Sequence, residues 1–244
     1  MNRDEALQSV RQNIKNENLV RHMLATEAIM RALAVRFNEN ADEWGLAGLL
    51  HDIDLELLGD DLTTHSKRSA EMAQQLGASG AVCHAIICHN GAHGEPFQTL
   101  MDKALYCADP LTGLITAAAL VRPEKKLSFV EVKSIRKRFK EKTFAAGANR
   151  EQIAKCSEIG MELDDFIALG LTAMQGAAES LGLRDIVTIV IPELTGDRSR
   201  RYFPEQFGGN VSGIHPDKFQ IPKSNYQTNS KFQYAIVKVS LLAP

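Results

Sequence analysis

The sequence lacks any apolar run long enough to cross a membrane. No stretch approaches the roughly 18 consecutive apolar residues that mark a membrane span. The first residues, MNRDEALQSVRQ, are charged and have a helical pattern, which predicts no secretory signal peptide. With 44% hydrophobic and 24% charged residues in 244, the composition is that of an ordinary soluble globular protein. We therefore expect a cytoplasmic protein.

Cysteine is scarce, and its spacing excludes the common thiol-based sites. The four cysteines are Cys83, Cys88, Cys107 and Cys156, and none forms a C-x-x-C pair with another. Three of them lie within apolar helical patterns, so we expect reduced, buried thiols and no zinc knuckle. The sequence also lacks a G-x-S-x-G elbow or another evident serine or cysteine nucleophile motif.

Charge is unevenly distributed, although the net charge is only -2. Residues 1–121 hold 9 Lys and Arg against 16 Asp and Glu, whereas residues 122–142 hold 9 against 3. An acidic region attracts metal cations, and a basic strip attracts phosphates. A solvated helix face is the simpler interpretation of the basic strip taken alone.

Hydrophobic periodicity predicts an all-α fold for most of the chain. Asn18, Thr63 and Asp109 are candidate N-caps, and Pro110 suits the first position of a helix. We expect helices over residues 3–16, 18–37, 41–52, 63–76, 80–89, 98–108, 110–121, 128–141, 150–158 and 163–181.

The composition changes near the C-terminus. Residues 186–244 hold five of the eight prolines and seven of the fifteen aromatic residues. The segments IVTIVIP and YAIVKVSLL read as strands, and the turn-rich stretch between them has no helical period. We therefore expect a helical domain over residues 1–184 and a β or irregular appendage over residues 185–244.

Four histidines and two aspartates fall on inward or apolar positions of the predicted helices. They are His22, His51, His65, His89, Asp52 and Asp109. A single buried histidine is usually a core residue with a hydrogen-bond partner, but six inward polar groups would each need such a partner. One metal centre satisfies all of them, and imidazole and carboxylate suit first-row divalent ions.

These residues carry a resemblance to a known family. His22, the pair His51 and Asp52 in GLLHDID, His65, His89 and Asp109 in YCADPLTG resemble the H…HD…H…H…D pattern of the HD-domain superfamily of metal-dependent phosphohydrolases. The resemblance covers roughly residues 18–182. It implies an all-helical domain that binds one or two divalent ions (Mn, Fe, Co, Ni, Mg or Zn) and cleaves phosphate esters or anhydrides, often of nucleotides.

The resemblance also implies a division of the ligands between two ions. His22, His51, Asp52 and Asp109 would bind the first ion, Asp52 would bridge, and His65 and His89 would bind the second. Asp109 has an alternative role as the N-cap before Pro110. His84 competes with His65 for a place in the set, and we expect it behind the ligands or in the core.

The expected reaction is attack of a metal-bound hydroxide on phosphorus, with Asp52 at the centre of catalysis. Asp54 could orient His51 or accept a proton, or could be a surface acid that starts a loop. We expect substrate contacts from the basic helix face in KKLSFVEVKSIRKRFKEK, from Lys67 and Arg68 next to His65, and from the NGAHGEP loop, for which a plain turn is the alternative. The predicted substrate-binding residues are Lys67, Arg68, His93, Lys133, Arg136 and Lys137.

The expected substrate is a small phosphorylated molecule, with a nucleotide favoured. A pI near 6.4 and the lack of exposed aromatics among the basic residues argue against nucleic acid; no membrane partner is expected, and a homo-oligomer remains open. Two other functions are compatible with the sequence. One is a non-catalytic HD module that binds metal and nucleotide as a sensor or scaffold, and the other is a di-iron oxygenase.

Overall fold

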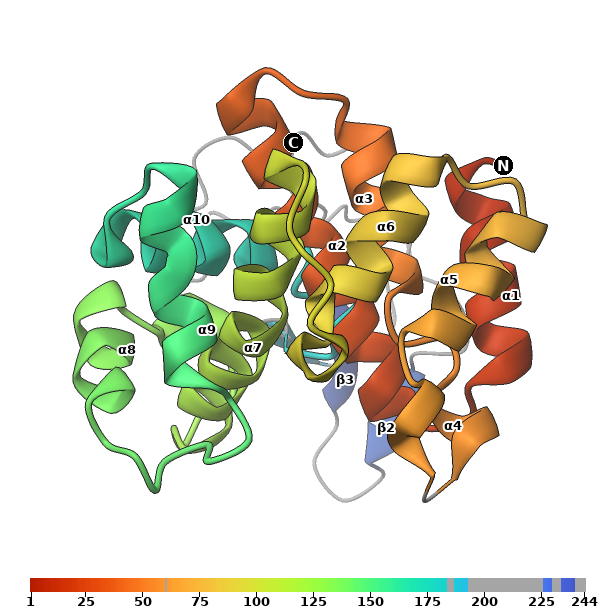
Figure 1. The fold of residues 1–244 in the computed structure, drawn as a ribbon. Coiled ribbons are helices and arrows are strands. Elements are labelled where there is room, and N and C mark those ends of the chain that lie inside the picture. The colour runs from red at the N-terminus through yellow and green to blue at the C-terminus, as the bar shows by residue number, and fades with distance from the viewer. Residues whose placement is uncertain (60, 184–186, 193–225, 230–233, 240–244) are drawn as a thin grey trace. The chain divides into compact units, whose positions relative to one another are not determined.

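The computed structural model describes residues 1–59, 61–183, 187–192, 226–229 and 234–239. The chain divides into two units, Met1–Arg184 and Asp185–Pro244. The first unit is built from helices joined by short connections (Figure 1), which confirms the predicted all-α fold class. No helix among the described residues combines the length and apolarity that a membrane crossing requires.

The helices follow one another along the first unit with only short 3₁₀ turns between some of them. The α-helices are α1 (Arg3–Asn13), α2 (Glu17–Phe37), α3 (Ala41–Leu50), α4 (Leu55–Leu58), α5 (Lys67–Gln75), α6 (Gly80–His89), α7 (Leu100–Leu120), α8 (Val132–Phe139), α9 (Arg150–Ala154) and α10 (Leu163–Gly176). The 3₁₀ turns are η1 (Leu62–Thr64), η2 (Gly91–His93), η3 (Leu127–Phe129) and η4 (Lys155–Ile159).

Helix α7 corrects one prediction. The sequence suggested two helices separated at Asp109 and Pro110, but α7 runs unbroken through both residues. Proline inside a helix removes one backbone hydrogen bond and crowds the preceding turn. This helix is nevertheless buried along much of its length, so tertiary packing holds it continuous. Asp109 is therefore not an N-cap, and Thr99 caps the helix instead through a capping box with Asp102.

The predicted helix 63–76 is also interrupted. Its first turn is η1, and the chain then breaks at His65 and Ser66 before α5 begins. Ser66 has a φ of 71°, a left-handed conformation that is uncommon for a residue with a side chain. Neither α4 nor this break has a clear signal in the hydrophobic pattern.

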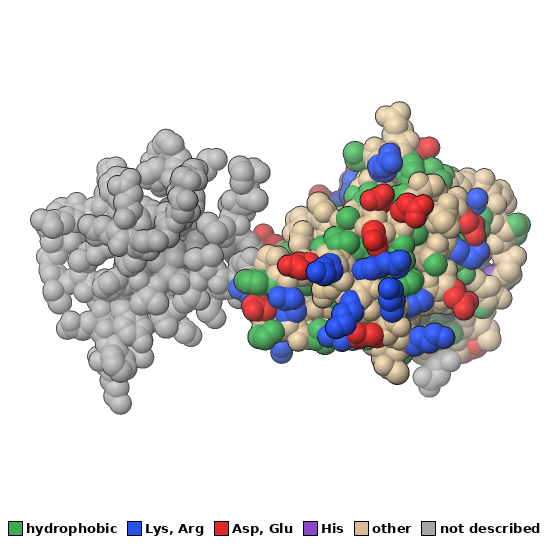
Figure 2. All heavy atoms as spheres, turned by 90° about the vertical axis from the view of Figure 1, so that its left-hand side faces the viewer, with side chains coloured by type: hydrophobic (Ala, Val, Ile, Leu, Met, Phe, Trp, Pro, Cys, Tyr) green, Lys and Arg blue, Asp and Glu red, His purple; other side chains and the backbone are tan. Residues whose placement is uncertain are grey.

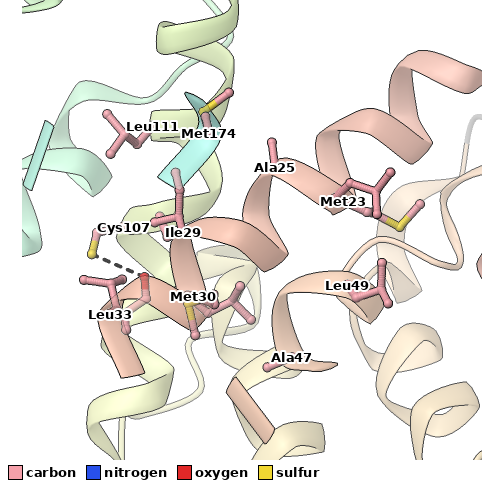
Figure 3. Packing of buried hydrophobic residues seen from close by; sticks show 14 of the residues in the cluster. Met23, Ala25, Ile29, Met30, Leu33, Ala47, Leu49, Cys107, Leu111 and Met174 are labelled. Carbon is pink, nitrogen blue, oxygen red and sulfur yellow. Dashed lines mark hydrogen bonds between the residues drawn. The ribbon is translucent and has the colours of Figure 1, made fainter. Parts of the chain in front are cut away.

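The core is centred on α2, which packs against α3 on one side and against α7 and α10 on the other. Figure 3 shows Ile29 and Leu33 of α2 on the side of Leu111 and Cys107 of α7, while Leu49 lies on the α3 side. These side chains are fully buried. Their burial fixes the two long helices that carry His22 and Asp109.

Glycine allows α3 to approach α2 at close range. A Cβ atom placed on Gly48 would lie 2.8 Å from backbone atoms of both Thr26 and Glu27. Backbone atoms cannot swing aside as a side-chain end can, so only glycine fits at this crossing. The close approach brings the end of α3 beside the first half of α2.

The second unit contains a small antiparallel sheet. Strands β1 (Val187–Pro192), β2 (Tyr226–Asn229) and β3 (Tyr234–Val239) are ordered β1-β3-β2, with Val187 opposite Val239 and Tyr226 opposite Val237. Strands β1 and β3 correspond to the two predicted strands. Strand β2 lies within the stretch that was expected to be turn-rich, so the sequence did not predict it. The remaining residues of the appendage lie outside the described residues.

Candidate metal centre

Five segments that are far apart in the sequence bring six polar side chains into one cluster. His22 comes from α2, the pair His51 and Asp52 follows α3, and Asp109 lies inside α7. His65 precedes α5 and His89 ends α6. These are the six residues that the sequence singled out as metal ligands.

One half of the cluster joins two imidazoles to two carboxylates. Oδ1 of Asp109 lies 3.0 Å from Nε2 of His22 and 3.7 Å from Nε2 of His51. Oδ2 of Asp52 lies 3.4 Å and 3.3 Å from the same two nitrogens. The side chains of His22 and Asp109 are about one-quarter exposed, at 26% and 25%. This half of the cluster is therefore open to a small molecule.

The other half uses the second oxygen of Asp52. Its Oδ1 lies 3.4 Å from Nε2 of His65 and 3.4 Å from Nε2 of His89. The two oxygens of one carboxylate thus face two separate pairs of histidines. This is the arrangement that a carboxylate bridging two ions requires.

The four imidazoles share one orientation, because each Nδ1 atom faces a hydrogen-bond acceptor and each Nε2 atom faces the cluster. In His51 and His89 the acceptors are backbone carbonyls three residues earlier, Gly48 O at 2.8 Å and Ile86 O at 2.5 Å. The Nδ1 atoms therefore carry the protons. In the neutral rings, the Nε2 atoms present lone pairs, as metal-ligating histidines do.

The hydroxyl of Thr112 orients His22 in the same way. Its oxygen lies 2.9 Å from Nδ1 of His22, and it donates its own proton to the carbonyl of Asp109 at 2.7 Å. The hydroxyl can thus only accept from His22. Nε2 of His22 then faces Nε2 of His51 at 3.1 Å with no proton on either neutral ring. Two opposed lone pairs at this distance require a cation, either a proton or a metal ion.

The pKa shifts of the clustered residues also indicate that the cluster favours positive charge. Burial disfavours charge on His22, yet hydrogen bonds to Asp109 and Asp52 outweigh it and raise the pKa of His22 to about 9. The pKa of His51 is likewise raised well above its usual value, because the same carboxylates outweigh burial. Neighbouring imidazoles hold the pKa values of Asp52 and Asp109 well below the usual range despite burial. A divalent ion would satisfy these carboxylates without protons.

Asp54 orients His65, whereas the sequence suggested His51. Its Oδ1 accepts from Nδ1 of His65 at 2.8 Å, and its Oδ2 accepts from the backbone N–H groups of Ser66 and Ser69 at 2.9 Å and 3.1 Å. Although burial opposes it, these donors lower the pKa of Asp54. The side chain is fully buried and both oxygens are engaged. Asp54 therefore acts through His65 as a positioning residue and is not placed to take a proton from substrate.

Three of the predicted substrate-binding residues, Lys67, Arg68 and His93, lie in the segments next to His65 and His89. Lys67 and Arg68 are exposed at the start of α5, and Arg68 pairs with Glu71 at 2.9 Å. His93 has its Nε2 atom 2.6 Å from the backbone oxygen of His65. The ring of His93 thus holds the loop after α6 to the segment that carries His65.

The basic residues of α8 form a separate group. Helix α8 packs on α7 and α10, and Arg136 pairs with Asp164 at 3.0 Å. Lys133 and Lys137 are exposed. Within the described part of the chain, none of the three has a hydrogen bond or ion pair to the six clustered side chains.

His84 also lies apart from the cluster. It was expected behind the metal ligands or in the core, and its Nδ1 atom lies 3.0 Å from Asp102 and 3.5 Å from the thiol of Cys88. Among the described contacts none joins His84 to the six residues. The inward face of α6 carries His89, whereas His84 and Cys88 share a different face.

Thr112 is a functional residue that sequence reasoning missed. A threonine inside an apolar helix is unremarkable, and its only signal is its place three residues after Asp109 in ADPLT. Its role follows from two hydrogen bonds that become visible only when α2 and α7 are placed side by side.

Thr112→Val should weaken metal binding by about 10–100-fold, the usual effect of removing a group that orients a metal-bound histidine. Thr112→Ser keeps the hydroxyl and should stay close to wild type. Calorimetric titration of each metal-free variant with Mn²⁺ gives the comparison. Equal affinities for the Val and Ser variants would contradict this role for the hydroxyl.

A buried cluster of histidine and aspartate side chains in a helical protein is a candidate metal-binding site. Residues 19–120 match the family model of the HD domain, and all six clustered residues fall within this range. This match agrees with the resemblance drawn from the sequence. The clustered histidine and aspartate side chains are groups that could hold a metal ion.

The curated relatives are partial matches. The chain is 30% identical over 97 residues to Ribonuclease Y of Chloroflexus aurantiacus, covering 40% of this chain and 19% of that protein. It is 26% identical over 138 residues to Ribonuclease Y of Lawsonia intracellularis, covering 55% and 26%. It is 29% identical over 169 residues to Ribonuclease Y 2 of Levilactobacillus brevis, covering 64% and 29%. The chain therefore spans less than a third of these relatives, and no solved structure matches it significantly.

Proposed function

We propose that this chain is a divalent-metal-dependent phosphohydrolase that cleaves a phosphate ester or anhydride of a small molecule, with a nucleotide as the favoured substrate. The observation that carries the proposal is the convergence of four Nε2 atoms on the two oxygens of Asp52. Nitrogen and carboxylate donors of this kind suit first-row divalent ions.

The two halves of the cluster define the ligands. His22, His51, Asp109 and Oδ2 of Asp52 would hold one ion, and Oδ1 of Asp52 with His65 and His89 would hold the other. When bound, such ions polarise a phosphoryl oxygen and lower the pKa of water. The cluster residues His22, His51, Asp52 and Asp109 each lie within 4 Å of at least two of the others, so they form a set even with a single ion.

The protein groups around the ligands fix the site before substrate arrives. Thr112 and Asp54 hold two of the rings, while backbone carbonyls hold the other two. Such preorganisation removes the cost of reorienting ligands during the reaction. Substrate would enter beside the partly exposed His22 and Asp109, and the exposed Lys67 and Arg68 would attract its phosphate.

A second candidate substrate is the phosphodiester backbone of RNA. The relatives are named as ribonucleases, and α8 presents Lys133, Lys137 and Lys140 to solvent. Figure 2 shows basic side chains gathered on the side of the molecule where α8 lies. Clustered lysines bind phosphate backbones without sequence preference. Because the sequence argues against nucleic acid, the nucleotide remains our first choice.

Metal removal followed by a substrate panel tests the proposal. The chelated protein should hydrolyse nothing, and Mn²⁺, Co²⁺, Ni²⁺, Fe²⁺ or Mg²⁺ should restore turnover of nucleotides or other phosphate esters. A short RNA belongs in the same panel. The doubly substituted Lys133→Glu, Lys137→Glu protein should lose RNA cleavage but keep nucleotide turnover if RNA uses the α8 face.

Binding without turnover would overturn the enzyme proposal. If the reloaded protein binds a nucleotide and a metal ion but cleaves no member of the panel, the chain is a sensor or scaffold module. Turnover that needs molecular oxygen would instead identify an oxygenase.

A further inference from the structure

A second group of metal-ligating side chains lies outside the HD cluster. His84 and Cys88 are one helical turn apart on α6, and both face Asp102 in the first turn of α7. Their donor atoms lie within 4.8 Å of one another. None of the three belongs to the six residues of the HD centre.

The spacing of these atoms fits a tetrahedral ion. A zinc ion with Zn–N of about 2.0 Å and Zn–S of about 2.3 Å separates its nitrogen and sulfur ligands by roughly 3.5 Å. The Nδ1 atom of His84 lies 3.5 Å from Sγ of Cys88. The same nitrogen lies 3.0 Å from Oδ2 of Asp102, only a few tenths of an ångström below the value for an oxygen ligand. Because Sγ of Cys88 also lies 3.9 Å from Nε2 of His84, the half-buried ring of His84 would have to rotate for Nδ1 and the thiolate to bind one ion.

Asp102 provides the independent sign of a missing ligand. Its side chain is fully buried. Oδ2 accepts from the backbone N–H groups of Gln98 and Thr99, both at 2.8 Å, but Oδ1 has no hydrogen-bond partner in the described structure. Buried carboxylate oxygens are normally satisfied. A cation beside Asp102 would explain both the burial of the charge and the unpaired oxygen.

We propose that His84, Cys88 and Asp102 bind a Zn²⁺ ion with water in the fourth position, separate from the HD centre. Thiolate and imidazole together favour zinc over the hard ions Mg²⁺ and Ca²⁺. Binding would exchange the thiol proton of Cys88 for the ion. Glu95 lies 3.6 Å from Nε2 of His84, where its carboxylate can orient the imidazole.

The location of this site gives it a mechanical role. It would tie the second half of α6 to the start of α7, across the connecting residues 90–99. His89, a ligand candidate of the HD centre, is the next residue after Cys88. The connection also carries His93, which contacts the backbone of His65. A zinc ion here would therefore brace the half of the HD centre that contains His65 and His89.

Cobalt substitution tests the site without any enzyme assay. Co²⁺ added to the metal-free full-length protein should give a near-ultraviolet thiolate-to-cobalt absorption band, which histidine and aspartate ligands alone do not produce. The band should persist in Asp52→Asn, in which the HD centre is disabled. It should also persist in Cys83→Ser, a matched control on the same helix, and disappear in Cys88→Ser.

A second variant and a second measurement distinguish loss of the zinc ligands from misfolding of the protein. His84→Gln alters a partly exposed side chain, so it should lose most of the cobalt band while keeping the wild-type circular dichroism spectrum. Zn²⁺ should raise the melting temperature of Asp52→Asn but not that of the Cys88→Ser, Asp52→Asn double variant. The absence of a band in wild type, or its survival in Cys88→Ser, would overturn the proposal; loss of hydrolysis alone would not.

Discussion

Asp52→Asn should lower metal-dependent turnover by about 10³-fold, the upper range for loss of one group that stabilises transition-state charge. The substitution keeps the size of the side chain but removes its negative charge and leaves one oxygen where two faced separate histidine pairs. One proposed ion position loses its oxygen ligand from this side chain, and the other keeps only a neutral amide oxygen there. Steady-state assays with saturating Mn²⁺, together with metal analysis of the dialysed protein, measure the two consequences.

Asp165→Asn is the matched control for this change. Asp165 is an exposed acid in the first turn of α10, away from all six clustered residues in sequence and on a different helix. It should retain wild-type turnover and metal content. If Asp52→Asn turned over substrate as fast as Asp165→Asn while both proteins remained folded, the assignment of Asp52 as the bridge would be wrong.

Gly48→Ala is expected to damage both stability and turnover. The added methyl group would meet the backbone of α2 at 2.8 Å, so α3 must move away, at a cost of about 1–3 kcal/mol for overpacking. His51 would move with α3, and the Nε2 atoms of His22 and His51 would separate from 3.1 Å. A displacement near 1 Å lowers turnover by about 10²-fold. Urea unfolding and kinetic assays give the two values.

Gly170→Ala separates the backbone clash from a general effect of adding a methyl group. The nearest atom to a Cβ on Gly170 is also 2.8 Å away, but it is the end of the Leu111 side chain, which can rotate. Alanine also favours a helix over glycine by about 0.5–1 kcal/mol. Gly170→Ala should therefore be much milder than Gly48→Ala. Equal losses would show that the α2 and α3 crossing is not the cause.

The fold was largely predictable because most helices show an apolar period and a cap. The expected segment 80–89 coincides with α6, and 18–37 differs from α2 by one residue at its start. The errors arose where tertiary packing overrides local rules. Pro110 signals a helix start, yet burial on both sides keeps α7 continuous. The left-handed Ser66 interrupts a helical pattern because Asp54 binds the freed N–H groups.

The six clustered residues could be named from the sequence because each one combines a ligating side chain with an inward position. Their supporting groups could not. Thr112 lies 90 residues from His22, and Asp54 lies 11 residues from His65 across a turn. Two of the groups that orient the imidazoles, Gly48 O and Ile86 O, are backbone atoms. Every residue has a backbone carbonyl, so the amino-acid type does not reveal this role. The exposed lysines of α8 were named for their charge alone, which does not say where a helix packs.

The groups that hold the Nδ1 atoms of the four imidazoles differ between the two halves of the cluster. Each half has one ring held by a backbone carbonyl, which no side-chain substitution can remove, and one ring held by a replaceable side chain. In the half with His22 that side chain is the neutral hydroxyl of Thr112, whereas in the half with His65 it is the anionic carboxylate of Asp54. A carboxylate makes an imidazole a stronger electron donor than a hydroxyl does. A substitution at Thr112 or at Asp54 should therefore change the metal affinity of one proposed ion position more than that of the other.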